Sequence, residues 1–194
     1  MISKLSKKIV NQLNILDDEQ ELYEYGFFIL LSQILYFIIA IIIGTICGTV
    51  FESIIFYIAF QFIRRYAGGY HASTETRCEI LSTLSILACI VVIKLSKTYD
   101  IQTVLLIIGA LSAVCIFVFC PLDTPEKPLT DKEFRYFRKI SWLILLAIVV
   151  AIIVSYIFKF KIVTVPCCLS LILESILLVA GKIKRVSQKN NVKT

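Results

Sequence analysis

Long runs of apolar residues dominate this chain and limit the folds it can adopt. The run at 27–63 carries one charged side chain, Glu52, and as a single helix it would be about 55 Å long, against a hydrocarbon core of about 30 Å. We therefore expect two spans that turn near residues 44–48. Of the 194 residues, 58% are hydrophobic and 18% are charged, which leaves more apolar surface than a soluble globule can bury. The sequence predicts an all-α, polytopic membrane protein.

The remaining apolar segments also come in pairs, so six transmembrane helices are expected. Residues 80–95 and 101–120 form one pair, and residues 140–158 and 162–180 form another. The predicted organisation is a single membrane domain, 1–194, made of an amphipathic N-terminal helix (1–25), a first hairpin (27–63), a polar segment that holds the candidate catalytic residues (64–79), a second hairpin (80–120), a proline-rich loop (121–139), a third hairpin (140–181) and a basic tail (182–194).

The first residues of the chain show helical periodicity. Ile2, Leu5, Ile9 and Leu13 recur at helical spacing with lysines between them. This pattern predicts an amphipathic helix lying on the cytoplasmic leaflet of the bilayer. An ordinary helix packed on the protein is the alternative. We expect no cleaved signal peptide, because no continuous apolar core with a cleavage site follows the first lysines.

The distribution of positive charge predicts the orientation of the chain. All but four of the 20 Lys and Arg residues lie near the N-terminus, at 64–79, at 121–139 or in the tail; the exceptions are Lys94, Lys97, Lys159 and Lys161. By the positive-inside rule, both termini and the segment 64–79 are expected to be cytoplasmic, in a multi-pass protein of the cell membrane. The net charge of +6 then needs no nucleic acid partner.

The polar segment contains the single histidine of the chain, His71, and a cysteine seven residues later, Cys78. A thiolate nucleophile requires a nearby base, and histidine is the commonest one. In one straight helix the two residues would lie about 10 Å apart along the axis, too far for proton transfer. The segment is therefore predicted to bend rather than to continue as a helix.

The residues around this pair supply such a bend. Gly68 and Gly69 free the backbone before His71, and Ser73 or Thr74 can cap a new helix that carries Cys78 in its first turn. Backbone amides of that turn, or of the glycine pair, could hold a developing oxyanion. The hypothesis is a base and nucleophile pair at the aqueous edge of the membrane.

A structural interpretation of the same residues also stands. A lone histidine at a membrane boundary is commonly an interface anchor or a hydrogen-bonded structural residue. Other cysteines lie in or beside apolar spans and are most simply small packing residues: Cys47, Cys89, Cys115, Cys167 and Cys168. Neither a disulfide framework nor a metal site is expected, since the segment faces a reducing compartment and no cluster of ligands is present. No cofactor is expected.

Two stretches of the sequence resemble a known family. Residues 65–72 (RYAGGYHA), followed by Cys78, resemble the signature of the accessory gene regulator B (AgrB) family, and residues 120–129 (CPLDTPEKPL) resemble its proline-rich cytoplasmic loop. The resemblance implies a membrane cysteine endopeptidase of quorum sensing, with His71 as general base and Cys78 as nucleophile. It further implies a homodimer in the bilayer.

The resemblance also implies a substrate and a reaction. The substrate is a short propeptide with an N-terminal amphipathic helix, a central cysteine or serine and an acidic C-terminal tail. Cys78 releases the tail, and the substrate's own side chain then displaces Cys78 to close a thiolactone or lactone. Among residues in the resembling motifs, Arg65 and Lys127 are candidates for binding the substrate together with Gly68 and Gly69, and Asp123 is a candidate to orient His71.

Two other classes of function remain open at this stage. A small six-span protein could be a transporter or channel component, although no chain of intramembrane charges or repeat of broken helices is present. It could also be a noncatalytic membrane protein that presents the peptide. Loss of peptide cleavage on replacement of Cys78 separates both from a peptidase.

Overall fold

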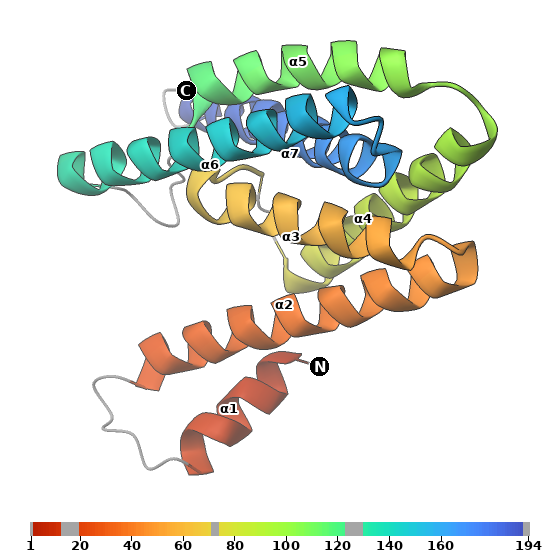
Figure 1. The fold of residues 1–194 in the computed structure, drawn as a ribbon. Coiled ribbons are helices and arrows are strands. Elements are labelled where there is room, and N and C mark those ends of the chain that lie inside the picture. Colours follow the sequence, from red (N-terminus) through yellow and green to blue (C-terminus); the bar gives the residue numbers. More distant parts are fainter. Residues whose placement is uncertain (1, 13–19, 71–73, 123–129, 192–194) are drawn as a thin grey trace.

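The computed structural model describes residues 2–12, 20–70, 74–122 and 130–191, and within them the chain forms seven α-helices and no strand (Figure 1). The helices are α1 (Ile2–Gln12), α2 (Gln20–Cys47), α3 (Val50–Ala67), α4 (Glu75–Thr98), α5 (Gln102–Phe119), α6 (Asp131–Ile157) and α7 (Lys161–Asn191). The prediction of an all-helical fold is confirmed.

Five of the described helices are long and apolar enough to cross a bilayer, which makes this a multi-pass membrane protein. They are α2, α5, α6, the part of α4 at Thr76–Thr98 and the part of α7 at Lys161–Ser187. The sequence predicts six spans, and the difference is α3. This helix has 18 residues but carries Glu52, Arg64 and Arg65, and charged side chains are costly in hydrocarbon.

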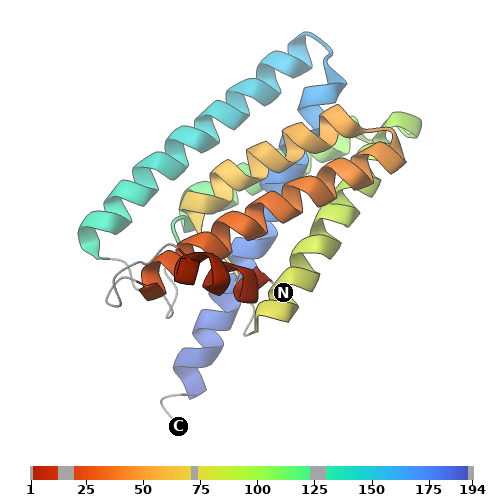
Figure 2. The ribbon, with the colours of Figure 1, turned by 90° about the horizontal axis from the view of Figure 1, so that it is seen from below.

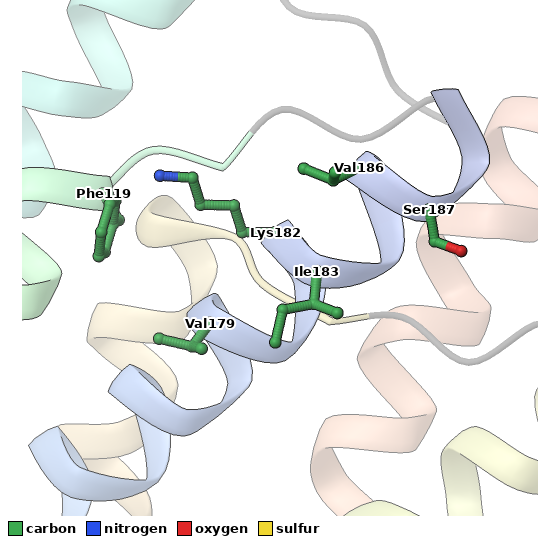
Figure 3. Close-up of a pocket in the computed structure, with 6 residues that line it drawn as sticks. All are labelled: Phe119, Val179, Lys182, Ile183, Val186 and Ser187. Carbon is green, nitrogen blue, oxygen red and sulfur yellow. The ribbon is translucent and has the colours of Figure 1, made fainter. Parts of the chain in front are cut away.

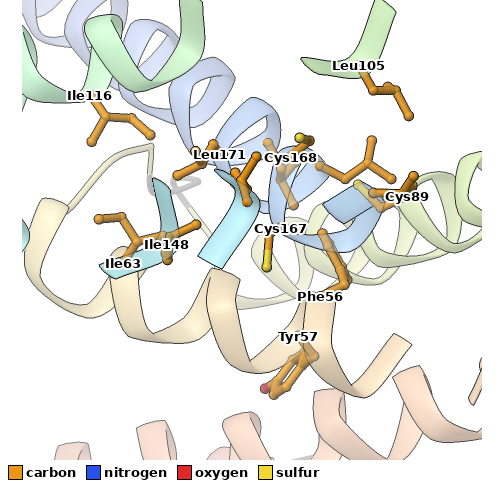
Figure 4. Packing of buried hydrophobic residues seen from close by; sticks show 14 of the residues in the cluster. Phe56, Tyr57, Ile63, Cys89, Leu105, Ile116, Ile148, Cys167, Cys168 and Leu171 are labelled. Atoms are coloured by element: carbon orange, nitrogen blue, oxygen red, sulfur yellow. The ribbon is translucent and has the colours of Figure 1, made fainter. Parts of the chain in front are cut away.

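Helix α7 lies at the centre of the bundle. Its apolar window is 67% buried, whereas the corresponding value is 22% or less for each of the other candidate spans. It packs against α3, α4, α5 and α6 (Figures 1 and 2). Buried side chains on α7, such as Cys168 and Leu171, meet Phe56 and Ile63 of α3 and Ile116 of α5 in one core (Figure 4). Helix α7 is therefore the central helix on which α3, α4, α5 and α6 pack.

Ion pairs join the three tight turns at one end of the bundle. Lys97 Nζ lies 2.6 Å from Glu52 Oε1 and donates to the Gly48 carbonyl oxygen at 3.1 Å. Lys161 Nζ lies 3.1 Å from Asp100 Oδ1. Gly48, with φ +69°, makes the predicted turn between α2 and α3. Because α3 begins at this end, it ends at the opposite one, together with the connections that follow α3 and α5.

Several helices extend beyond the predicted boundaries. Helix α6 begins at Asp131 rather than at 140, because Thr130 and Glu133 form a capping box that starts the helix inside the predicted loop. Helix α7 continues to Asn191, through most of the predicted tail. Helix α2 begins at Gln20, seven residues before the start of the predicted first hairpin at 27.

The N-terminal helix α1 packs against α2, and Lys7 Nζ lies 3.3 Å from Glu24 Oε1. Residues 13–19, between the two helices, lie outside the described part of the chain. The structure therefore gives a helix at the predicted place, and its position on a membrane surface stays a prediction.

Candidate active site

Cys78 lies in the first turn of α4, as the sequence predicts. Thr74 is the N-cap residue: its side-chain oxygen accepts a hydrogen bond from the Arg77 amide at 3.4 Å, and its carbonyl accepts one from the Cys78 amide at 3.1 Å. The Cys78 side chain is half-buried. His71 lies outside the described residues, so the contact between His71 and Cys78 stays a prediction.

Helix α2 borders the thiol. Tyr36 of α2 interacts with Ser82 of α4, one turn beyond Cys78, and the two helices pack against each other. The candidate nucleophile therefore lies one turn from a contact between α4 and α2. Its environment thus combines an apolar helix face with the polar start of another helix.

Residues 68–70, here called the strap, follow α3 in a conformation that ends the helix. Gly68 has φ +78° and Gly69 has φ +133°, values at which side chains with a Cβ are strained. The Gly68 amide still donates to the Arg64 carbonyl at 3.3 Å, and the helix stops there. The predicted bend is confirmed, and its physical cause is the glycine pair.

The strap is fastened to α7 by a backbone hydrogen bond. The Tyr70 amide donates to the Leu177 carbonyl at 2.9 Å. This approach requires a glycine one helical turn later, at Gly181, because a Cβ there would lie 2.9 Å from both the Gly69 carbonyl carbon and the Tyr70 nitrogen. Tyr70 directly precedes His71, so the hydrogen bond to α7 fixes the backbone one residue before the candidate base.

Replacing Gly181 with alanine is expected to push the strap away from α7. The added methyl would overlap the strap backbone, and overpacking of this kind costs about 1–3 kcal/mol. Hydrogen–deuterium exchange of the Tyr70 amide should become at least about tenfold faster. Gly26→Ala is the matched control, since no atom lies within 4 Å of its added Cβ. Unchanged exchange at Tyr70 in Gly181→Ala would contradict the packing described here.

The connection after α5 also reaches the strap. The Leu122 amide donates to the Ala67 carbonyl at 2.8 Å, and a Cβ on Gly68 would lie 2.7 Å from the Leu122 carbonyl oxygen. The two regions that carry the sequence motifs therefore meet at this end of the bundle. Asp123 and Lys127, the candidate histidine orienter and substrate-binding lysine, lie outside the described residues.

The two arginines before the strap point in different directions. Arg65 is exposed, with its guanidinium 5.9 Å from the Tyr66 ring centre, which suits the predicted contact with substrate without testing it. Arg64 turns inward and donates to the Gly68 carbonyl and the Tyr70 carbonyl, each at 2.6 Å. Its Nη1 lies 3.9 Å from Oε1 of Glu174, which is fully buried on α7.

The sequence motif points to Arg65, whereas the pair formed by Arg64 and Glu174 does not follow from it. Arg64 and Arg65 are neighbours in the sequence, so their positions do not show which of them contacts the strap. The contacts of Arg64 depend on which face of α3 meets α7. The available signal was Glu174, an acidic residue inside an apolar run, because such residues are expensive and need a cationic partner.

An open groove lies between the end of α5 and the last part of α7 (Figure 3). Its volume is about 520 Å³. The lining is mainly apolar with one cation, and it consists of Phe119, Val179, Lys182, Ile183, Val186 and Ser187. The Lys182 ammonium lies 3.8 Å from the centre of the Phe119 ring. Its α7 residues lie on both sides of Gly181 in the sequence, from Val179 to Ser187.

The cysteines differ in their access to solvent. Cys89, Cys120, Cys167 and Cys168 are buried, whereas Cys47, Cys78 and Cys115 are half-buried. At Cys120, which follows α5, burial raises the pKa of the thiol above its ordinary value. Among the described residues, no group of three or more His, Cys, Asp or Glu side chains is placed to hold a metal ion.

Alkylation should distinguish Cys78 from Cys120. A raised pKa lowers the thiolate fraction at a given pH, so at pH 7 we expect iodoacetamide to modify Cys78 at least about tenfold faster than Cys120. The rate at Cys120 should increase as the pH approaches its raised pKa. Peptide mass mapping after timed labelling in detergent measures both rates, and equal rates at pH 7 would contradict the burial difference.

Comparison with known proteins places the chain in a family. The family model described as accessory gene regulator B matches residues 2–178. A protein named as AgrB-like from Clostridium perfringens (strain SM101 / Type A) is 30% identical over 152 residues, which cover 74% of this chain and 71% of the relative. A second from Clostridium perfringens (strain 13 / Type A) is 28% identical over 151 residues, with coverage of 74% and 71%. A third, from Listeria innocua serovar 6a, is 28% identical over 124 residues, with coverage of 61% and 58%.

No solved structure matches this chain. The family match extends over both motifs and over most of the helical bundle. The chain belongs to the accessory gene regulator B family, which is linked to accessory gene regulator quorum sensing.

Proposed function

We propose that this protein is a membrane cysteine endopeptidase that removes the C-terminal tail of a short autoinducer propeptide. Family membership suggests a role in peptide processing. The observation that carries the proposal is the half-buried Cys78 thiol in the first turn of a capped helix, directly after the bend made by Gly68 and Gly69. His71 is proposed as the general base, since it lies in the three-residue connection between Tyr70 and Thr74, both of which are held by hydrogen bonds.

The proposed reaction has two acyl transfers. His71 takes the proton of the Cys78 thiol, and the sulfur attacks the carbonyl carbon before the tail. The C–N bond breaks, and the His71 imidazolium gives its proton to the leaving amine. The propeptide's own cysteine then attacks the thioester carbonyl as a thiolate, which forms the thiolactone and releases Cys78. A serine at the same place in the substrate gives a lactone.

Water must be kept from the acyl-enzyme, because a thioester hydrolyses more favourably than the peptide bond it replaces. A site at the edge of the bilayer favours this exclusion, since one side of the reacting group is covered by apolar surface. The border between α2 and the start of α4 supplies such a surface next to Cys78. We propose that attack by the propeptide's own cysteine on the acyl-enzyme is therefore faster than attack by water.

Binding of the propeptide is proposed at two neighbouring regions. The apolar groove beside Gly181 suits one face of the propeptide's amphipathic helix, with Lys182 at its edge. The acidic tail is proposed to meet exposed cations on the first turns of α6, Lys132, Arg135 and Lys139, together with Arg65. Lys127 is a further candidate outside the described residues.

The proposed orientation places the strap and both termini in the cytoplasm. Most Lys and Arg residues lie at the end of the bundle that carries the strap, as the positive-inside rule requires. In this arrangement α3 is the sixth span, and Glu52 near its outer end forms an ion pair with Lys97 of α4. Helix α1 lies on the inner leaflet. A homodimer in the cell membrane is proposed with it.

Incubation of the purified protein with a propeptide of this design tests the proposal. The peptide carries an amphipathic start, one central cysteine and an acidic tail, and intact-mass spectrometry follows both components. We expect free tail, a cyclised product that has lost one water relative to the linear fragment, and a transient acyl adduct on Cys78. Tail release without any adduct on Cys78, or a peptide left intact, would contradict it.

A further inference from the structure

The Arg64 and Glu174 pair links the central helix to the strap. Glu174 is fully buried in α7, and neither of its carboxylate oxygens has a hydrogen-bond partner. The nearest cation is Arg64, at 3.9 Å, and the Arg64 side chain is itself only 18% exposed. A buried carboxylate in this setting is costly unless a cation compensates it. Arg64 is thus the cation placed beside Glu174, while its N–H groups are directed to other acceptors.

Those N–H groups are used on the strap backbone. Arg64 Nη1 donates to the Gly68 carbonyl and Nη2 donates to the Tyr70 carbonyl, both at 2.6 Å. The planar guanidinium thus fixes two peptide groups of the strap in one rigid geometry. Backbone hydrogen bonds from Tyr70 to Leu177 and from Leu122 to Ala67 hold the same segment from two other sides.

We propose that Glu174 is a positioning residue, which acts through Arg64 to hold the strap, the segment that leads directly into His71. The inference rests on the proposed peptidase function for its kinetic consequence. Its structural part, that Glu174 immobilises the strap through Arg64, holds independently of any activity. Glu174 touches no reacting group in this scheme, so it should affect turnover rather than binding of the propeptide.

Two measurements on Glu174→Gln test the proposal, one with and one without catalysis. The variant keeps the volume of the side chain and replaces its ionisable carboxyl group with a neutral amide. We expect exchange of the Tyr70 amide to become at least about tenfold faster. The kcat for tail release should fall about ten- to a hundredfold with KM within about twofold, because a small misplacement of a catalytic group has effects of this size.

Matched variants separate positioning from general stability. Glu52→Gln makes the same chemical change in the other buried carboxylate, at the opposite end of the bundle, and should leave both readouts unchanged. Glu174→Asp keeps the carboxyl group and should recover part of the lost kcat and of the Tyr70 protection. If Glu174→Gln does not fold, the same two measurements are made on Glu174→Asp, whose shorter side chain should give smaller losses in the same direction.

Two outcomes would overturn the proposal. One is unchanged exchange and turnover in Glu174→Gln. The other is faster exchange throughout α7 with a matching loss of thermal stability, and no recovery in Glu174→Asp, which would show a merely structural residue. If the wild-type protein cleaves no propeptide while Glu174→Gln still frees the Tyr70 amide, the peptidase function fails and the role of Glu174 at the strap stands.

Discussion

Cys78→Ala is expected to abolish tail release, with a loss of at least about a thousandfold in kcat/KM. The alanine lacks the sulfur that forms the acyl-enzyme, and removal of a covalent nucleophile has effects of this size or larger. His71→Ala should give a comparable loss, because base and nucleophile act as a unit. Release of tail from a propeptide by vesicles containing each variant, followed by mass spectrometry, measures both effects.

Cys47→Ala is the matched control for this loss. Cys47 is half-buried like Cys78 and also lies at a helix terminus, but at the opposite end of the bundle. Its replacement should leave tail release within about twofold of the wild-type rate, since it removes only a small packing group.

The same experiment separates the peptidase from the other two classes of function. A transporter or channel component should keep most of its transport in Cys78→Ala or Cys78→Ser. A membrane protein that only presents the peptide to another protease should show cleavage in cells with both Cys78→Ala and His71→Ala. Cleavage that survives either change in a purified system would eliminate the proposed mechanism.

Gly69→Ala is expected to displace Arg64 from the strap. Its φ of +133° is strained for alanine, at a cost of about 1–2 kcal/mol, and the added Cβ would collide with the Arg64 guanidinium. Arg64 must then leave the Gly68 and Tyr70 carbonyls. We expect tail release to fall about a hundredfold, because the segment that carries His71 loses its support.

Gly48→Ala separates backbone strain from the collision. Gly48 has φ +69°, but no atom lies within 4 Å of its added Cβ, and it lies in the turn at the far end of the bundle. This variant should lose about 1 kcal/mol of stability and keep its tail release. Equal losses of activity in the two variants would show that the effect of Gly69→Ala is global destabilisation rather than displacement of Arg64.

Helix boundaries show how far local signals reach. The apolar runs predict the turns after α2, α4 and α6, because charged and glycine residues interrupt each run at these places. The early start of α6 was also readable, since Thr130 and Glu133 have the spacing of a capping box. The three charges of α3 mean that its composition does not decide whether it crosses the membrane. The structure shows that α3 runs from one end of the bundle to the other.

The candidate site divides in the same way. The bend at Gly68 and Gly69 and the start of α4 at Thr74 follow from residue types that act within a few positions of themselves. Arg64 and its partner Glu174 lie 110 positions apart in the sequence. No local pattern therefore predicts that Arg64 turns inward toward Glu174. The need for a glycine at Gly181 depends on a strap that arrives from another part of the chain.

By itself, the sequence determined a helical membrane protein with a polar segment that bends before Cys78, because apolar length, capping and glycine conformations are local properties. Only the tertiary structure decided that α7 is the central helix and that Glu174, Leu177 and Gly181 hold the strap. Those contacts depend on which faces of α3 and α7 pack together, and the packing of one face against another is a property of the assembled bundle.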